Sequence, residues 1–350
     1  MSYRVTVEPL GREIECRADQ PILDACLRAG IWLPHSCTHG TCGTCKGELL
    51  DGEVDQGDSS AFALMDFERD EGKVLLCQAT PRSDVVIEGD VEVEDGLEFF
   101  PVRDFAGTVV ELVEIARDIR RLRIELDEDL HFSPGQYVAL KVPGSAATRT
   151  YSMANPPSER RVIELHVKRT PGGLASDGWI FSTLAVGDRI DLTGPYGRFI
   201  FRMARDEPAI MVAGGTGLAP ITSMIRHLLA DPGSEHEIYL YQGARTEADL
   251  YGVEEFRALA AAHPDRFRYR PCLSEQAWDG ATGLVTDVID AEFDRCAGHV
   301  GYVCGPPPMV DAALRLLMRK RLFPRDIYRE DFFDEADKAA GGVKSPLLKR

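Results

Sequence analysis

The chain has 350 residues, which is too many for one ordinary compact domain, so two or three domains are expected. Its 44% apolar and 28% charged content is that of a soluble globular protein, and no apolar run approaches the roughly 20 residues that span a bilayer. The net charge of −17 argues against a nucleic-acid partner, because nucleic-acid binders carry the opposite sign.

The negative charge is concentrated near the N-terminus. Residues 1–100 hold 8 Lys and Arg against 21 Asp and Glu, whereas the other 250 residues hold 32 against 36. This excess fits solubility, and equally an N-terminal third that is steered towards a basic protein surface. The opening MSYRVTVEPL alternates like a strand and lacks the apolar core of a signal peptide, so a cytoplasmic location is expected. Cytoplasmic thiols stay reduced, and clustered cysteines there more often serve metals than disulfides.

The first hundred residues predict a small α/β unit. The alternation in Tyr3–Val7 and Glu13–Cys16 predicts a hairpin. The stretch DQPILDACLRAG predicts a capped amphipathic helix between Asp19 and Gly30. A second short helix is expected over residues 60–71, and KVLLCQA predicts a buried strand that delivers Cys77.

The cysteine spacing is the strongest signal in the sequence. The cysteines in question are Cys37, Cys42, Cys45 and Cys77. Zinc ribbons use two Cys-x2-Cys pairs, and a c-type haem needs His where Lys46 stands. A Rieske centre needs two His ligands, and a thioredoxin-like pair leaves two of the four cysteines unexplained. What remains is the Cys-x4-Cys-x2-Cys…Cys spacing of a plant-type [2Fe–2S] cluster, with His35 and His39 interpreted as loop residues.

The middle third predicts an antiparallel barrel with a phosphate clamp. After an acidic linker over residues 96–101, short alternating strands run from about Phe105 to Thr193. In TRTYSMANPP, Arg149 can grip a pyrophosphate, Tyr151 can lie against a flat ring and Ser152 can donate to a ring nitrogen. Taken alone, this short motif fits a plain strand better. The following HVKRTPGGLAS adds Lys168 and a glycine turn that leads into a helix, whose N-terminus favours phosphate.

The last third predicts a parallel, doubly wound sheet. A buried strand, a glycine turn and a helix are predicted for PAIMVAGGTGLAPITSMIRHLLA. The same strand–turn–helix pattern recurs in GYVCGPPPMVDAALRLLM. Gly215, Thr216 and Gly217 in the first turn allow a pyrophosphate to approach the backbone. Both turns follow the C-terminal ends of strands, so both are expected to face one crevice.

These motifs resemble those of the ferredoxin–NADP⁺ reductase superfamily. Residues 1–95 resemble a plant-type ferredoxin with a β-grasp fold, residues 102–204 a six-stranded antiparallel FAD-binding barrel, and residues 205–335 an NAD(P)H-binding α/β domain. A flexible tail over residues 336–350 completes this α/β multidomain architecture.

The resemblance implies a set of cofactor-binding residues. The flavin contacts would be Arg149, Tyr151, Ser152, His166, Val167, Lys168, Gly173, Leu174, Ala175 and Ser176. The NAD contacts would be Gly215, Thr216, Gly217, Glu247, Gly305 and Pro306, and the residues at the reacting rings Ser152, Cys304 and Phe332. Either Phe332 or Phe333 would cover the flavin, although core packing is nearly as good an interpretation for both. QGARTEADLY offers both Arg245 and Glu247 near the second strand, and the resemblance favours NADH over NADPH.

Together the three domains predict electron transfer. A flavin can take a hydride from NADH and pass single electrons to a [2Fe–2S] cluster, which hands them to an acceptor. GTCGTCK and the stretch from GEVDQGD to IEGDV resemble phenol hydroxylase reductases, which implies a separate diiron hydroxylase as partner, docked through the acidic ferredoxin domain. The chain has no Glu-x-x-His pairs for a diiron site of its own.

Other interpretations of the sequence remain open. The chain could be the reductase of a propane, alkene or methane monooxygenase, or of a Rieske ring-hydroxylating dioxygenase. From a different class, it could be a redox-sensing module that carries a flavin and a cluster, or a zinc-stapled binding protein. A sensor would turn over an artificial acceptor slowly, and a zinc protein would be colourless.

Overall fold

The computed structural model describes residues 1–36, 38, 40, 42–57, 59–61, 63–91 and 96–332. The expected cluster ligand Cys37, the loop residue His39, the aromatic Phe333 and the tail 336–350 therefore lie outside the described residues. The chain forms two compact units, one made of Met1–Asp104 with Thr193–Arg198 and the other of Phe105–Leu192 with Phe199–Arg350. No helix in the described part of the chain combines the length and the apolar character that a membrane crossing requires.

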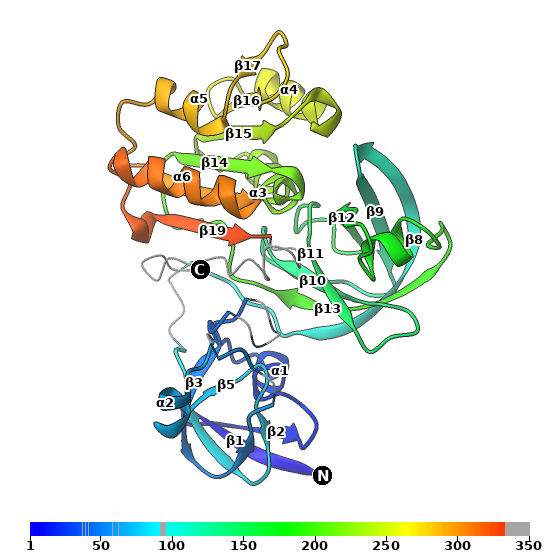
Figure 1. The fold of residues 1–350 in the computed structure, drawn as a ribbon, viewed down its shortest axis with the longest axis vertical. Helices are drawn as coiled ribbons and strands as arrows, with labels where there is room; N and C mark the ends of the chain where they lie inside the picture. The colour runs from blue at the N-terminus through cyan, green and yellow to red at the C-terminus, as the bar shows by residue number, and fades with distance from the viewer. Residues whose placement is uncertain are drawn as a thin grey trace. The chain divides into compact units, whose positions relative to one another are not determined.

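The first unit is built on a five-stranded sheet in the order β2-β1-β7-β3-β5 (Figure 1). Its strands are β1 (Ser2–Glu8), β2 (Arg12–Arg17), β3 (Lys46–Asp51), β5 (Lys73–Leu75) and β7 (Val85–Glu88), and β4 (Val54–Asp55) pairs with β6 (Thr80–Pro81) beside it. The predicted hairpin is confirmed as the antiparallel pair β1 and β2. The inward side chains Val5 and Val7 pack in one core with Cys26 of helix α1 (Ile22–Arg28).

Three details of this unit differ from the sequence prediction. Helix α1 has no side-chain cap, because Pro21 stands at its N-cap and offers no side-chain acceptor, while Asp19 pairs with Arg17 at 3.2 Å. The helix expected over residues 60–71 is only α2 (Asp66–Asp70), because Ala63 and Leu64 turn back to bond the Ser60 carbonyl. Strand β5 ends at Leu75, so Cys77 lies in the following turn and not in the strand itself.

The barrel is a six-stranded sheet in the order β11-β10-β13-β8-β9-β12. Its strands are β8 (Arg103–Ala116), β9 (Ile119–Leu126), β10 (Tyr137–Lys141), β11 (Thr148–Ser152), β12 (Val162–Lys168) and β13 (Arg189–Tyr196). A bridge between Met153, which follows β11, and Leu165 of β12 joins the two edge strands and closes the barrel. Both residues are fully buried, together with Leu122 and Ile124. The alternation of apolar residues in the sequence therefore predicted correctly which side chains face the inside of the barrel.

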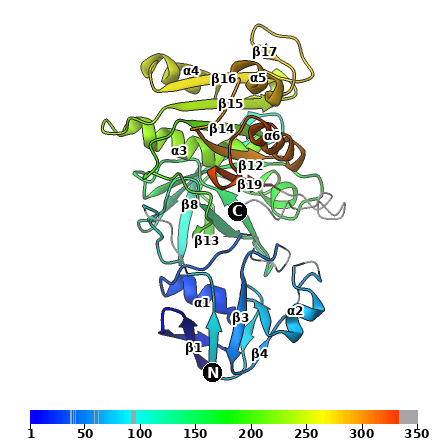
Figure 2. The same ribbon diagram turned by 90° about the vertical axis from the view of Figure 1, so that its left-hand side faces the viewer.

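The last third forms a parallel sheet in the order β17-β16-β15-β14-β18-β19. Its strands are β14 (Ala209–Gly214), β15 (Ile238–Ala244), β16 (Phe267–Leu273), β17 (Ala281–Thr282), β18 (Val300–Gly305) and β19 (Ile327–Asp331). Figure 2 shows α3 (Leu218–Ala230) and α4 (Val253–Ala262) on one face, and α5 (Val285–Glu292) and α6 (Pro307–Arg319) on the other. The predicted fold class, with a β-grasp ferredoxin domain, a flavin-binding barrel and a doubly wound nucleotide-binding sheet, is confirmed.

The strand order creates a switch point between β14 and β18. The chain runs outwards from β14 to β15 and β16, then crosses over to place β18 on the other side of β14. In open α/β sheets, ligands bind outside the carboxyl ends of strands at such a point. Both glycine turns predicted from the sequence follow these two strands.

Candidate functional site

The cysteine loop in the first unit is a tightly curled segment. Gly40 and Gly43 have left-handed backbone angles, with φ of 72° and 70°. A Cβ on Gly43 would lie 3.0 Å from the Ala63 carbonyl oxygen, so no larger residue fits without movement. The amide of Gln78 donates to the carbonyl of Thr38 at 3.3 Å and thereby ties the loop to the turn that carries Cys77.

The described cysteines fit a two-iron cluster. Cys45 and Cys77 are buried and Cys42 is half-buried. The hydrogen bond between the Cys45 thiol and Cys77, followed by burial, raises the pKa of Cys45. Among the described residues, no three Cys, His, Asp or Glu side chains converge to hold a single metal ion. A [2Fe–2S] cluster does not need such a convergence, because each iron takes two thiolates. Both ring nitrogens of His35 face backbone groups, Leu33 O at 2.8 Å and Gly197 N at 3.1 Å, as expected for a loop residue.

The barrel presents an arginine for which the described residues provide no carboxylate partner. Arg149 lies on β11 and donates to the Thr148 carbonyl at 2.8 Å, and it makes no ion pair with any described residue. Tyr151 lies two residues further along the same strand, where burial raises the pKa of its hydroxyl to about 12. An unpaired guanidinium next to a largely covered aromatic ring suits a phosphate and a flat ring system.

The glycine loop after β12 adds backbone donors to this arrangement. A Cβ on Gly173 would lie 2.8 Å from both the Ser176 hydroxyl and the Thr170 carbonyl oxygen, so the loop needs glycine there. The Ser176 hydroxyl accepts from the Thr170 N–H at 3.0 Å and holds the loop closed. The N–H groups of Leu174 and Ala175 have no acceptor within the described ranges and are available to a ligand. The helix predicted after this loop is only η1 (Ser176–Ile180), a single wide turn.

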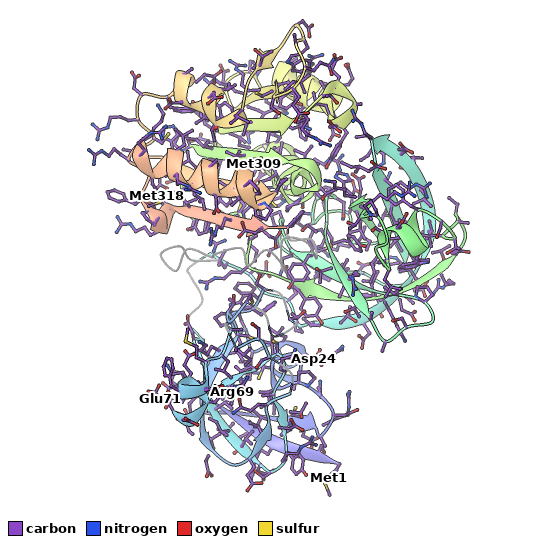
Figure 3. The ribbon with its side chains drawn as sticks, in the orientation of Figure 1. Met1, Asp24, Arg69, Glu71, Met309 and Met318 are labelled. Atoms are coloured by element: carbon purple, nitrogen blue, oxygen red, sulfur yellow. The ribbon has the colours of Figure 1, made fainter. Side chains whose placement is uncertain are left out.

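The two glycine turns of the parallel sheet pack directly against each other. A Cβ on Gly217, which ends the short turn η2 (Gly215–Gly217), would lie 2.3 Å from the Cys304 carbonyl oxygen. A Cβ on Gly214 would lie 2.6 Å from the sulfur of Met309, a residue of α6 labelled in Figure 3. Ala213 and Cys304 are direct neighbours in the register of β14 and β18. The structure thus brings the two predicted turns together, with α3 starting at Leu218 directly behind them.

The barrel meets this sheet at a half-buried polar contact. The hydroxyl of Ser152 donates to Glu330 at 3.3 Å, and Glu330 is the register partner of Cys304 in the neighbouring strand β19. Burial, with a smaller contribution from the charge of Asp331, raises the pKa of Glu330 to about 8. Burial also raises the pKa of Cys304, and the Glu330 charge adds to this. At neutral pH the site therefore holds a neutral carboxyl group and a thiol, both able to donate hydrogen bonds.

The other predicted residues lie around this centre. The N–H of Phe332 bonds the Gly305 carbonyl at 3.2 Å, and its half-buried ring packs against the core under α3. Lys168 ends β12, is exposed and makes no ion pair in the described part of the chain. Glu247 starts the short turn η3 (Glu247–Asp249) and accepts from the Gln276 amide at 2.5 Å, whereas Arg245 lies 4.0 Å from Asp249.

Sequence reasoning missed Glu330 in the second unit and, separately, Gln78 in the first. Glu330 stands in YREDFF, a stretch whose prediction concerned only the aromatic residues, and it lies on strand β19 (Ile327–Asp331), which the sequence did not predict. Ile327, Tyr328 and Arg329 are all buried, so no alternation marks this strand, which has only 5 residues. Gln78 follows the fourth cysteine directly, and only its contact with Thr38 gives it a role.

Three sequence-family models match the chain. They are described as a 2Fe-2S iron-sulfur cluster binding domain (residues 5–82), an oxidoreductase FAD-binding domain (residues 106–201) and an oxidoreductase NAD-binding domain (residues 211–315). The chain therefore carries binding domains for a [2Fe–2S] cluster, FAD and NAD, as the sequence predicted.

Known proteins resemble the chain over nearly its whole length. It is 49% identical to the reductase component of phenol 2-monooxygenase from Pseudomonas sp. strain CF600, with 100% of both chains covered. It is 47% identical to the phenol hydroxylase P5 protein of Acinetobacter pittii, with 100% of this chain and 99% of that one covered. Among solved structures, an Amycolatopsis cytochrome P450 reductase is 43% identical and superposes with a TM-score of 0.87, covering 94% of this chain and 98% of that one.

Proposed function

Because the chain belongs to the family of NADH-dependent iron–sulfur flavoprotein reductases that serve multicomponent monooxygenases, we propose that it supplies electrons to a phenol-hydroxylating diiron oxygenase. The contact that carries this proposal joins Ser152 of the barrel to Glu330 of the nucleotide-binding sheet. It places the predicted flavin strand beside the two glycine turns, which is the arrangement that hydride transfer between two bound rings requires.

We assign the cofactor contacts as follows from the observations on the site. Arg149 and the N–H groups of Leu174 and Ala175 would hold the FAD pyrophosphate, and Tyr151 would cover a face of the flavin. The backbone of Gly215–Gly217 and the start of α3 would hold the NADH pyrophosphate. Cys42, Cys45 and Cys77, with Cys37, would ligate the cluster.

When bound, NADH, FAD and the cluster supply hydride transfer followed by one-electron transfer. The residues of the chain contribute placement and protons. Ser152 is held by Glu330, so its hydroxyl oxygen is fixed where it can serve a ring nitrogen. Glu330 keeps its proton at neutral pH because of burial, so the hydrogen bond from Ser152 ends on a neutral carboxyl group. Gly217 and Gly305 bring the backbone close enough to exclude water beside Cys304.

Cluster assembly is tested by Cys77→Ser, with Cys26→Ser as the matched control. Both cysteines are buried in the core of the first unit, but only Cys77 lies in the cluster turn. We expect Cys77→Ser to lose iron and acid-labile sulfide, to keep FAD absorbance, and to reduce ferricyanide but not cytochrome c. The control should keep its iron. Equal iron in the two variants contradicts the ligand assignment.

Flavin binding is tested by Arg149→Ala, with Arg160→Ala as the control. Arg160 is exposed in the loop before β12, whereas Arg149 lies unpaired on β11. We expect purified Arg149→Ala to retain several-fold less FAD than the control variant, because a charge-assisted bond to phosphate is lost. Equal flavin content in both variants rules out Arg149 as the clamp.

We further propose that the oxygenase component binds the acidic first unit in the cytoplasm, where the reduced thiols can take up iron and sulfide. The excess of 21 acidic over 8 basic residues in the first hundred supports a basic partner surface. The association rate with purified phenol hydroxylase should fall steeply as salt is raised. A salt-independent rate contradicts this docking mode. The likeness to a cytochrome P450 reductase favours one second candidate, a haem oxygenase as acceptor, and coupled NADH consumption with each purified oxygenase separates the two.

A further inference from the structure

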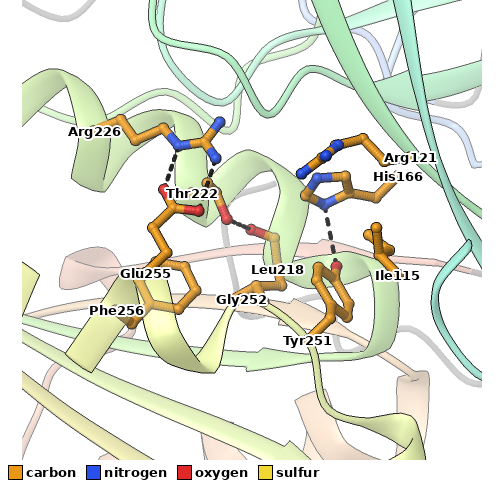
Figure 4. Close-up of a pocket in the computed structure, with 10 residues that line it drawn as sticks. All are labelled: Ile115, Arg121, His166, Leu218, Thr222, Arg226, Tyr251, Gly252, Glu255 and Phe256. Carbon is orange, nitrogen blue, oxygen red and sulfur yellow. Dashed lines mark hydrogen bonds and ion pairs between the residues drawn. The ribbon is translucent and has the colours of Figure 1, made fainter. Parts of the chain in front are cut away.

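Tyr251 lies where the flavin strand of the barrel meets the dinucleotide turn. It is buried, with 7% of its surface exposed, in the segment between η3 and α4. Its ring stands edge-on to that of His166, with centroids 5.1 Å apart at 87°. Figure 4 shows the two side chains in direct contact, pointing at each other. Both line a cavity of about 200 Å³, together with Arg121 and Arg226.

The Tyr251 hydroxyl has two neighbours that compete for its one hydrogen. The Nδ1 atom of His166 lies 3.2 Å from the hydroxyl oxygen, and the Gly215 carbonyl oxygen lies 3.1 Å away on the dinucleotide turn. A phenol carries a single hydrogen, so it can donate to only one of them at a time. While it donates to the Gly215 carbonyl, the contact with His166 is a hydrogen bond only if Nδ1 carries a hydrogen and donates to the hydroxyl oxygen.

The other nitrogen of His166 is fixed by Glu164. Nε2 lies 3.1 Å from a carboxylate oxygen of Glu164. Burial alone would raise the pKa of Glu164. The hydrogen bond to His166 and the charge of Arg226 outweigh burial and lower this pKa to about 2. Glu164 is therefore ionised, and Nε2 donates to it. Burial lowers the pKa of His166, only partly offset by Glu164. In the neutral ring Nδ1 accepts from Tyr251, and in the charged ring it donates to Tyr251.

Several charged or titratable groups face this pair from the elements packed around it. They are Arg121 and Arg123 on β9, Glu164 on β12, Arg226 on α3, Glu255 on α4 and the thiol of Cys304 on β18. Arg226 binds Glu255 through two bonds of 2.7 and 2.9 Å and reaches Glu164 at 3.1 Å. These ion pairs largely compensate the charges near His166. The protonation of Nδ1 is therefore the state that changes with pH in this group of residues.

We propose that Tyr251 is a positioning residue that couples the protonation of His166 to the seating of the dinucleotide turn. The inference rests on the proposed function, because the turn at Gly215 is assigned there to NADH. When His166 is charged, the Tyr251 hydroxyl holds the Gly215 carbonyl and the turn is preorganised for the pyrophosphate. When His166 is neutral, the hydroxyl turns to His166, and the carbonyl keeps only the N–H of Leu218 at the start of α3. A preorganised turn binds its ligand more tightly.

The test uses Tyr251→Phe, with Tyr241→Phe as the matched control. Tyr241 is also buried and also loses one hydroxyl bond, to Glu292 at 2.6 Å, on the other side of the sheet. NAD⁺ binding to the oxidised, FAD-loaded protein is measured by calorimetry between pH 5 and 7. The wild type and Tyr241→Phe should bind up to about fivefold more tightly at the lower pH, the value of one neutral hydrogen bond. Tyr251→Phe should bind with the weaker affinity at every pH.

A second measurement follows the histidine directly. By linkage, saturating NAD⁺ should raise the pKa of His166 in the wild type, seen in the ¹⁵N resonances of the ring, and leave it unmoved in Tyr251→Phe. A Tyr251→Phe variant with the wild-type pH dependence, or a wild type without one, overturns the coupling. If NADH fails to reduce the bound FAD in the wild type, the proposed function itself fails, and that outcome is distinct from either of these.

Discussion

The raised pKa of Glu330 makes a prediction about stability that needs no substrate. Glu330 shifts from 4.5 to about 8 on folding, because it is covered by the contact with the barrel and lies next to Asp331. Between these two pH values the folded chain keeps a proton that the unfolded chain has lost. The stabilising contribution is therefore complete below about pH 4.5 and is lost progressively as the pH rises to 8. Each pH unit in this window costs up to about 1.4 kcal/mol of the free energy of unfolding.

The substitution Glu330→Gln removes this titration and keeps the shape and the bond from Ser152. From pH 5.5 to 7.5 the wild type should lose about 2–3 kcal/mol relative to Glu330→Gln, which is an upper value because the carboxyl is only partly buried. For a unit of this size that corresponds to a calorimetric midpoint difference that widens by about 5–10 °C. Glu254→Gln, on an exposed side chain of α4, is the control and should follow the wild type. Parallel midpoints of wild type and Glu330→Gln across this range would refute the reasoning.

Three further substitutions test the backbone and the loop contacts. Gly217→Ala forces a Cβ to 2.3 Å from the Cys304 carbonyl and should weaken NAD⁺ binding more than tenfold in calorimetry, whereas Gly233→Ala, whose nearest neighbour is an Asp231 oxygen at 3.3 Å, should bind normally. Gly173→Ala crowds Ser176 and Thr170 at 2.8 Å and should lower the FAD content of the purified protein several-fold, while Gly178→Ala, with its nearest atom at 3.7 Å, should not; equal flavin in both would contradict a cradle of this shape. Gln78→Leu cuts the tie to Thr38 and should release iron to a chelator several-fold faster than the wild type, with an unchanged rate counting against the role of Gln78.

The sequence predicted the fold well because its signals were local. Strands such as β12 alternate between the barrel core and the outer face, so Ile163, Leu165 and Val167 mark the inward side without any tertiary information. The parallel sheet was predicted from buried strands that are followed by a glycine turn and a helix, as at β14 and α3. Errors fell where tertiary contacts decide, for example at Ser60, whose N–H bonds the Gly40 carbonyl in the cysteine loop at 3.0 Å, while α2 begins only at Asp66.

The site was less predictable, because several of its residues are brought together by strand pairing and not by a local sequence motif. Arg149, Gly173 and the cysteines stand in recognisable patterns, and each could be named from its own neighbours. Glu330 has no such pattern. It belongs to the site because β19 pairs with β18 so that Glu330 adjoins Cys304, and because Ser152, 178 residues earlier in the chain, donates to it. Tyr251 likewise acquires its place only through the distances to His166 and Gly215.

The crossover between β14 and β18 explains why backbone packing, and not side-chain contacts, limits which substitutions this site tolerates. Gly214, Gly217 and Gly305 stand with atoms of the neighbouring turn or of Met309 inside 3.0 Å of where a Cβ would be. Two parallel strands that end side by side can each send a turn to one ligand only if neither turn carries bulk between them. A side chain such as Arg149 can be shortened at the cost of one contact, whereas an added methyl group at Gly217 must push two strand ends apart. We therefore expect a glycine-to-alanine substitution in these turns to weaken dinucleotide binding more than the truncation of any single polar side chain around them.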